Sequence, residues 1–95
     1  MATSKKEMPA IKKSDGRLYM DTPGGEAELL YRIVGSIMSI HHTFVPEAER
    51  GKGLAEMLAY EAFSMARLQG LKVRPDCAYI RHYVEKHQEV KDLVA

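Results

Sequence analysis

The first half of the chain alternates between apolar and polar positions in the way that β-strands do. Runs of this kind cover residues 8–13, 17–22, 26–34 and 37–45, and glycine-containing turn sequences separate them. Short glycine turns between β-rich runs are typical of hairpins. The sequence therefore predicts an antiparallel meander of up to four strands in the first 45 residues.

Strict alternation also assigns a face of the sheet to each residue of the last two runs. In residues 26–34 one face carries Ala27, Leu29, Tyr31 and Ile33. In residues 37–45 one face carries Met38, Ile40, His42 and Phe44, and the other carries Ile37, Ser39, His41 and Thr43. The pattern thus predicts that His42 shares a face with Met38 and Ile40.

After residue 53 the apolar residues recur with the period of a helix, and Gly70 is expected to end this helix. The predicted apolar face carries Leu54, Met57, Leu58, Ala62, Met65 and Ala66. Residues 71–74 are typical of a fifth strand ended by Pro75, and residues 79–86 of a second helix, followed by a short terminal segment at 88–95. A helix between strands requires a crossover, so the fifth strand should run parallel to the fourth. The predicted fold class is α+β, a mixed and mostly antiparallel sheet in the order ββββαβα.

Length and charge narrow the class of protein. Ninety-five residues suffice for one domain, expected over 1–95 with a flexible tail at 1–7. A net charge of +1, from 14 basic and 13 acidic residues, predicts no nucleic-acid partner. No apolar run approaches the roughly 18 residues of a membrane helix. The N-terminus does not have the pattern of a secretory signal. One cysteine cannot form an internal disulfide, which is typical of a reducing compartment. We expect a cytoplasmic protein without a membrane partner, a monomer or weak dimer.

Two glycines and two basic residues stand between the fourth strand and the first helix, in the stretch Arg50-Gly51-Lys52-Gly53. A strand, a glycine turn and a helix N-terminus together can bind an anion, because the first-turn amides are free and glycine lets a phosphate approach. The alternative is a tight turn without a ligand. The four histidines, at 41, 42, 82 and 87, have no metal-ligand spacing, so no metal site is predicted.

The stretch from Arg50 to Ala55 fits R/Q-x-x-G-x-G/A, and it resembles the pyrophosphate-binding signature of the GNAT superfamily of N-acetyltransferases. The flanking stretches His42–Pro46 and Pro75–Tyr79, with Tyr83 following, extend the resemblance to the compact single-domain Yjdj-type group of GNAT-like proteins. It implies the acyl-CoA N-acyltransferase fold, in which the fourth and fifth strands are parallel and splayed.

The resemblance implies that acetyl-CoA is the cosubstrate and that an amine, either a small amine or an exposed lysine, attacks its thioester directly. The pantetheine arm would bind the fourth strand at Thr43, Phe44 and Val45. The pyrophosphate would bind the turn formed by Arg50, Gly51, Lys52, Gly53, Leu54 and Ala55. The chain lacks the helices that larger members carry between the first two strands, so an open acceptor site is expected.

Four side chains are candidates for catalysis. His42 could accept the proton of the amine, and Cys77 would lie beside the acetyl group, as a nucleophile or as a packing residue. Tyr79 and Tyr83 open the last helix and could protonate the leaving thiolate, or could simply fill the core. Two other functions stay open: a non-catalytic or partner-dependent acyl-CoA-binding module, and a small interaction domain that binds no nucleotide.

Overall fold

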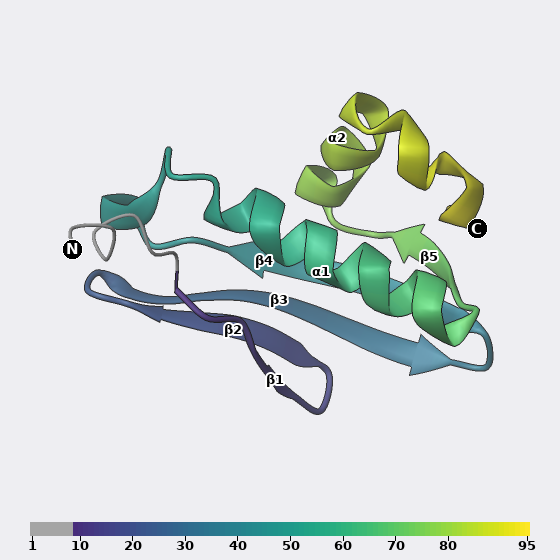
Figure 1. Cartoon of the computed structure of the whole chain (residues 1–95), viewed down its shortest axis with the longest axis horizontal. Helices are drawn as coiled ribbons and strands as arrows, with labels where there is room; N and C mark the ends of the chain where they lie inside the picture. Colours follow the sequence, from purple (N-terminus) through teal and green to yellow (C-terminus); the bar gives the residue numbers. More distant parts are fainter. Residues whose placement is uncertain (1–8) are drawn as a thin grey trace, which may run out of the picture.

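One mixed sheet organises residues 9–95, the part of the chain that the structure, a computed structural model, describes (Figure 1). Its strands lie in the order β1-β2-β3-β4-β5, with β4 and β5 parallel and the other neighbours antiparallel. The elements are β1 (Lys12–Ser14), β2 (Arg17–Thr22), β3 (Gly25–Val34), β4 (Ile37–Phe44), η2 (Glu47–Glu49), α1 (Leu54–Gln69), β5 (Lys72–Pro75), α2 (Ala78–Lys86) and η3 (Gln88–Leu93). The predicted α+β class and the order ββββαβα are confirmed.

The first strand is shorter and later than the pattern predicted. The run at 8–13 was expected to form it, but β1 covers Lys12–Ser14, and Ser14 pairs with Arg17 across the turn at Asp15-Gly16. A two-residue turn of this kind, with Gly16 at φ +75°, fixes which residues face each other. The start of the predicted strand, like the predicted tail at 1–7, lies outside the described residues.

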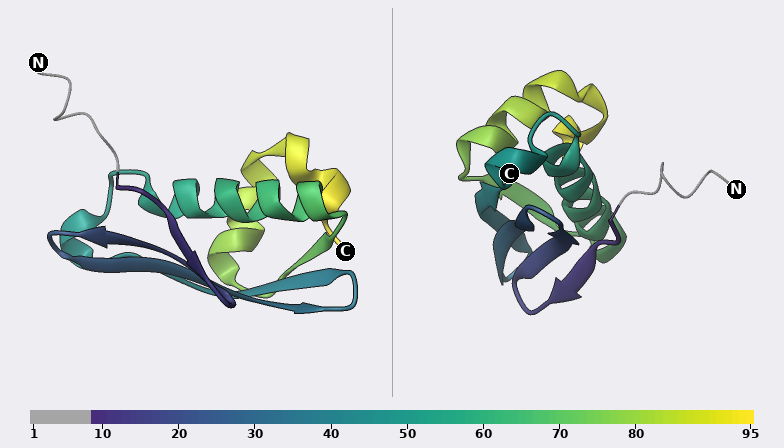
Figure 2. Two further views of the ribbon diagram at one scale, coloured as in Figure 1. Left: turned by 60° about the horizontal axis from the view of Figure 1, so that its bottom comes forward. Right: turned by 90° about the vertical axis from the view of Figure 1, so that its left-hand side faces the viewer.

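Both helices lie on the same face of the sheet, as the end-on view in Figure 2 shows. We call this the helix face of the sheet. The core fills the space between the helix face and the helices. Its fully buried members come from both layers and include Leu18, Met20, Leu29, Met38, Ile40, Leu58, Val73 and Ile80. The opposite face of β2, β3 and β4, which we call the free face, carries no helix within residues 9–95.

A bulge in β4 overturns the predicted assignment of faces. His42 pairs with Leu30 and Ile40 pairs with Tyr31, so His41 has no partner residue on β3. One extra residue shifts the alternation by one position. Thr43 therefore shares the helix face with Met38 and Ile40, and His42 lies on the free face. The prediction that His42 shares a face with Met38 and Ile40 was wrong.

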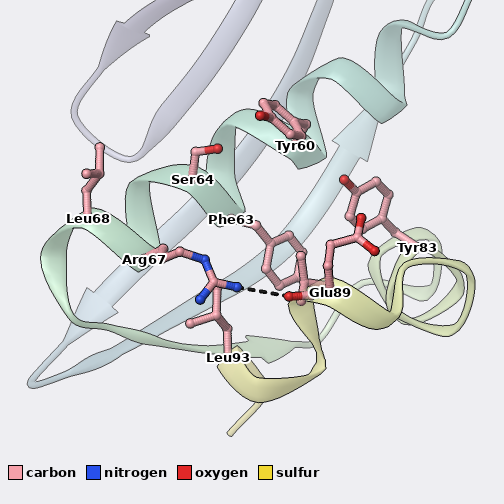
Figure 3. A pocket seen from close by; sticks show the side chains of 9 residues that line it. Tyr60, Phe63, Ser64, Arg67, Leu68, Tyr83, Glu89 and Leu93 are labelled. Carbon is pink, nitrogen blue, oxygen red and sulfur yellow. Dashed lines mark hydrogen bonds between the residues drawn. The ribbon is translucent and has the colours of Figure 1, made fainter.

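The end of the chain is fastened to α1 and β5. Arg67 of α1 donates to both carboxylate oxygens of Asp92, at 3.0 and 3.1 Å, and to the Glu89 carbonyl at 2.9 Å, and Figure 3 shows the guanidinium turned toward this segment. The Ala95 amide donates to the Val73 carbonyl at 2.8 Å. Over the described residues, no helix has both the length and the apolar character needed to cross a membrane.

Candidate functional site

The turn between β4 and α1 has the backbone conformation of an anion cradle. Gly51 and Gly53 adopt φ of +83° and +81°, and a Cβ on either would meet no atom within 4 Å. L-residues rarely adopt such angles, which is why both positions favour glycine. Within the described chain, the Arg50 amide donates to the Glu47 carbonyl at 3.2 Å, and the next amide with a backbone acceptor is that of Met57, which donates to the Gly53 carbonyl at 3.1 Å. The amides between Arg50 and Met57 are thus available to a ligand.

These amides border a cavity of about 380 Å³ between the turn and the start of α2. Seven of its lining residues are predicted site residues: Val45, Arg50, Gly51, Gly53, Leu54, Ala55 and Tyr79. The other two, Glu49 and Glu56, were not predicted. The remaining candidates, His42, Thr43, Phe44, Lys52, Cys77 and Tyr83, do not line this cavity.

Glu49 holds the turn in place. Its side chain is buried, accepts a hydrogen bond from the Gly24 amide at 3.0 Å, and pairs with Lys52 at 2.9 Å. The hydrogen bond from Lys52 is the main reason why the pKa of this carboxyl lies below its usual value. No motif could reveal this role, because the partner amide lies 25 residues earlier, in the β2–β3 turn.

Arg50 is also tied to the backbone, because its Nε donates to the Val45 carbonyl at 3.0 Å. The guanidinium therefore lies at the end of β4, next to the cavity that Val45 and Arg50 both line. A guanidinium with further free N–H groups at this point favours an anionic ligand.

Strands β4 and β5 separate before β4 ends, and Val45, the residue after β4, lines the cavity. Their pairing ends at Ile40 and Pro75, and the Ile40 carbonyl then accepts the amides of both Asp76 and Cys77 at 3.1 Å. Asp76 fixes the point of separation, since it accepts hydrogen bonds from Ser39 at 2.5 Å and from Arg74 at 2.9 Å. Beyond it the backbone edge of β4 faces a gap instead of a strand. The predicted splay of strands 4 and 5 is confirmed.

The Cys77 thiol lies at this gap, 3.4 Å from the Thr43 hydroxyl, at the N-cap of α2. Burial alone would raise its pKa. Hydrogen bonds from the Thr43 hydroxyl and from the backbone amides of Ile80, Tyr79 and Thr43 outweigh burial, so the pKa of the thiol lies below its usual value. Asp76 does not oppose this effect at close range, because its carboxylate is turned toward Ser39 and Arg74.

The two tyrosines of α2 have different surroundings. Tyr83 is buried and stacks between Phe63, at 5.5 Å between ring centroids, and His87, at 4.0 Å. Burial raises its pKa to about 12. Tyr79 lines the cavity, and burial also raises its pKa. Tyr83 is therefore a core residue, and Tyr79 is the tyrosine that borders the cavity at the glycine turn.

His42 lies apart from the cavity, on the free face of β4, where its Nε2 is 3.5 Å from Glu28 Oε2. Its side chain is 47% exposed, so solvent or a second molecule can reach it. Within residues 9–95, no group of three or more histidine, cysteine or acidic side chains has an arrangement that could hold a metal ion.

Comparison with known proteins gives the family. The model of the family described as GCN5-related N-acetyl-transferase matches residues 17–93, which is most of the chain and includes every predicted site residue. The chain belongs to this family. Its GCN5-related fold has a solved counterpart in the NMR solution structure of a GCN5-like protein from Staphylococcus aureus, with a TM-score of 0.70 and 26% identity over 90% of this chain and 87% of the other.

Curated relatives match this GCN5-related chain over a shorter stretch. Protein NATD1 of Gallus gallus and of Mus musculus are each 42% identical to it over 62 residues, which is 64% of this chain and 56% of the relative. Protein NATD1 of Danio rerio is 38% identical over 63 residues. The match thus spans a little over half the length of these relatives.

Proposed function

We propose that this protein binds acetyl-CoA and transfers the acetyl group to an amine. The observation that carries the proposal is the juxtaposition of two features: a glycine cradle with available amides, and the open edge of β4 beside it. The residues present fit this ligand. The space where a Cβ would stand at Gly51 and Gly53 is free for a phosphate, and Arg50 adds positive charge next to it.

The chain's own groups can supply the remaining chemistry. Backbone groups of Thr43, Phe44 and Val45 would hold the pantetheine arm as a neighbouring strand would, and a β4 amide would polarise the thioester carbonyl. Tyr79 is protonated at neutral pH, as tyrosine ordinarily is, and burial raises its pKa further. Its hydroxyl can therefore donate a proton to the departing thiolate, whereas His42 accepts one from the amine.

Calorimetry and thermal unfolding with acetyl-CoA test the binding half of the proposal. At a free concentration a hundredfold above Kd, the ligand should stabilise the protein by about 2.7 kcal/mol. For a chain of this size that is a rise in Tm of roughly 10–20 °C. No shift at millimolar acetyl-CoA would contradict the proposal and favour an interaction domain. Binding without acetylation of any amine would favour an acyl-CoA-binding module.

For Cys77 we predict a place in the acetyl pocket without an obligatory covalent role. Cys77→Ala should bind acetyl-CoA nearly as well as the wild type and keep most of the transfer rate, because an amine can attack the thioester directly. The alternative is that the thiol attacks the thioester, and the lowered pKa of the thiol favours the thiolate that would do so. Mass spectrometry tests this alternative. A hydroxylamine-labile acetyl-Cys77 that forms and decays at the rate of turnover would overturn this prediction.

A further inference from the structure

On the free face, a chain of polar contacts crosses three strands and ends at His42. Arg17 of β2 lies with its guanidinium carbon 4.2 Å from the centre of the Tyr19 ring. Its Nε donates to Glu28 Oε1 of β3 at 2.8 Å, and its NH2 group pairs with Glu26. The other oxygen of Glu28, Oε2, faces Nε2 of His42 at 3.5 Å.

This arrangement depends on the bulge at His41. Cross-strand pairing places Glu28 opposite Phe44 and Leu30 opposite His42, so Glu28 and His42 are diagonal neighbours on one face. In a regular β4 His42 would lie on the helix face, out of reach of Glu28. The bulge also places Thr43 on the helix face beside Cys77. His42 and the Thr43–Cys77 contact thus approach the same open edge of β4 from opposite faces.

We propose that Glu28, fixed by Arg17, is a positioning residue that orients His42 as the general base of the transfer reaction. The inference rests on the proposed function. A carboxylate at Nε2 favours the tautomer with its proton on Nε2, and this leaves the Nδ1 lone pair free to accept a proton. Within residues 9–95, Glu28 is the carboxylate that lies within 4 Å of this ring.

The proton inventory of the reaction balances with these groups. Nδ1 of His42 takes one proton from the acceptor ammonium, which leaves a neutral amine. The amine nitrogen forms a bond to the thioester carbonyl carbon, and the carbon–sulfur bond breaks with its electron pair on sulfur. A second proton from the nitrogen neutralises the thiolate through Tyr79 or water, and His42 releases its own proton to solvent. The acceptor reaches His42 across the free face, which no described element covers.

The structure offers matched controls for a test. Glu28→Gln keeps the size of the side chain and removes its charge, and Glu26→Gln removes the other carboxylate on Arg17, which does not contact His42. We expect Glu28→Gln to lower kcat about tenfold or more, with the KM for acetyl-CoA unchanged, and Glu26→Gln to behave like the wild type. His42→Ala should lose about a hundredfold in kcat, whereas His41→Ala should lose little.

A second readout does not depend on activity. The ¹⁵N shifts of the His42 ring should show mainly the Nε2–H tautomer in the wild type and in Glu26→Gln, and a mixture in Glu28→Gln. If Glu28→Gln leaves the tautomer ratio and kcat at wild-type values, the inference is wrong. If the wild type transfers no acetyl group, the proposed function fails and the catalytic part of the inference fails with it, but the tautomer measurement still decides whether Glu28 orients His42.

Discussion

Gly53→Val should abolish tight binding of acetyl-CoA. The Cβ and its two methyl groups would stand in the open space over the first turn of α1, where the proposed pyrophosphate has to approach the amides. Loss of two charge-assisted hydrogen bonds, at ~1.5 kcal/mol each, corresponds to a hundredfold or more in Kd. Calorimetry with acetyl-CoA measures the effect directly.

This substitution also destabilises the fold, and the control must share that effect. Gly53 has φ +81°, so valine there should cost roughly 1–2 kcal/mol in backbone strain, whatever its helix propensity. Gly35, in the β3–β4 turn, has φ +62°, and a Cβ added there would also meet no atom within 4 Å. Gly35→Val should therefore lose comparable stability and keep its affinity for acetyl-CoA. Equal affinities in the two variants would show that the phosphates do not bind at this turn.

Phe63→Ala should strongly destabilise the fold although Phe63 lies outside the candidate site. Phe63 is 2% exposed and connects α1 to Tyr83 of α2 through stacked rings. Truncation of a buried phenylalanine typically lowers the free energy of unfolding by about 3–5 kcal/mol. For a chain of this size that lowers Tm by more than about 12 °C.

Tyr60, one turn earlier on α1 and 66% exposed, provides the matched control. Both side chains border the cavity between α1 and η3, as Figure 3 shows, but only Phe63 reaches the core. Tyr60→Ala should change Tm by a few degrees at most. A Phe63→Ala variant as stable as Tyr60→Ala would mean that α2 is held mainly by its other contacts. Thermal unfolding followed by circular dichroism measures both variants.

The sequence predicts those parts of the fold that are encoded locally. Gly51 and Gly53 mark a left-handed turn because glycine itself permits that backbone. The apolar period predicts part of the buried face of α1, but Met57 and Met65 are only partly buried, and Ala59 and Phe63, which the prediction left out, are buried. The bulge at His41 has no such signal. Polar residues occur on both faces of β4 near this point, so a regular and a bulged strand fit the pattern equally well. Only pairing with β3 distinguishes them.

Polar contacts between residues far apart in the chain could not be predicted from the sequence either. Glu49 reaches a backbone amide in another turn, and Glu28 meets His42 only because the bulge brings them to one face. Neither contact follows from residue type or spacing along the chain. The part of the site formed by a continuous segment was predicted, and the part formed by side chains from separate strands was not.

The bulge at His41 also matters for anyone who wishes to redesign β4. The strand has two phases of alternation, one for positions 37–40 and another, displaced by one residue, for positions 42–44. A mutant library that varies every second residue from position 37 would change free-face residues at 37 and 39. Beyond the bulge it would change Thr43, which lies on the helix face. A library confined to the free face has to vary positions 37, 39, 42 and 44. A search for new acceptor amines should begin with positions 37 and 44, because Ser39 holds Asp76 and His42 is the proposed base.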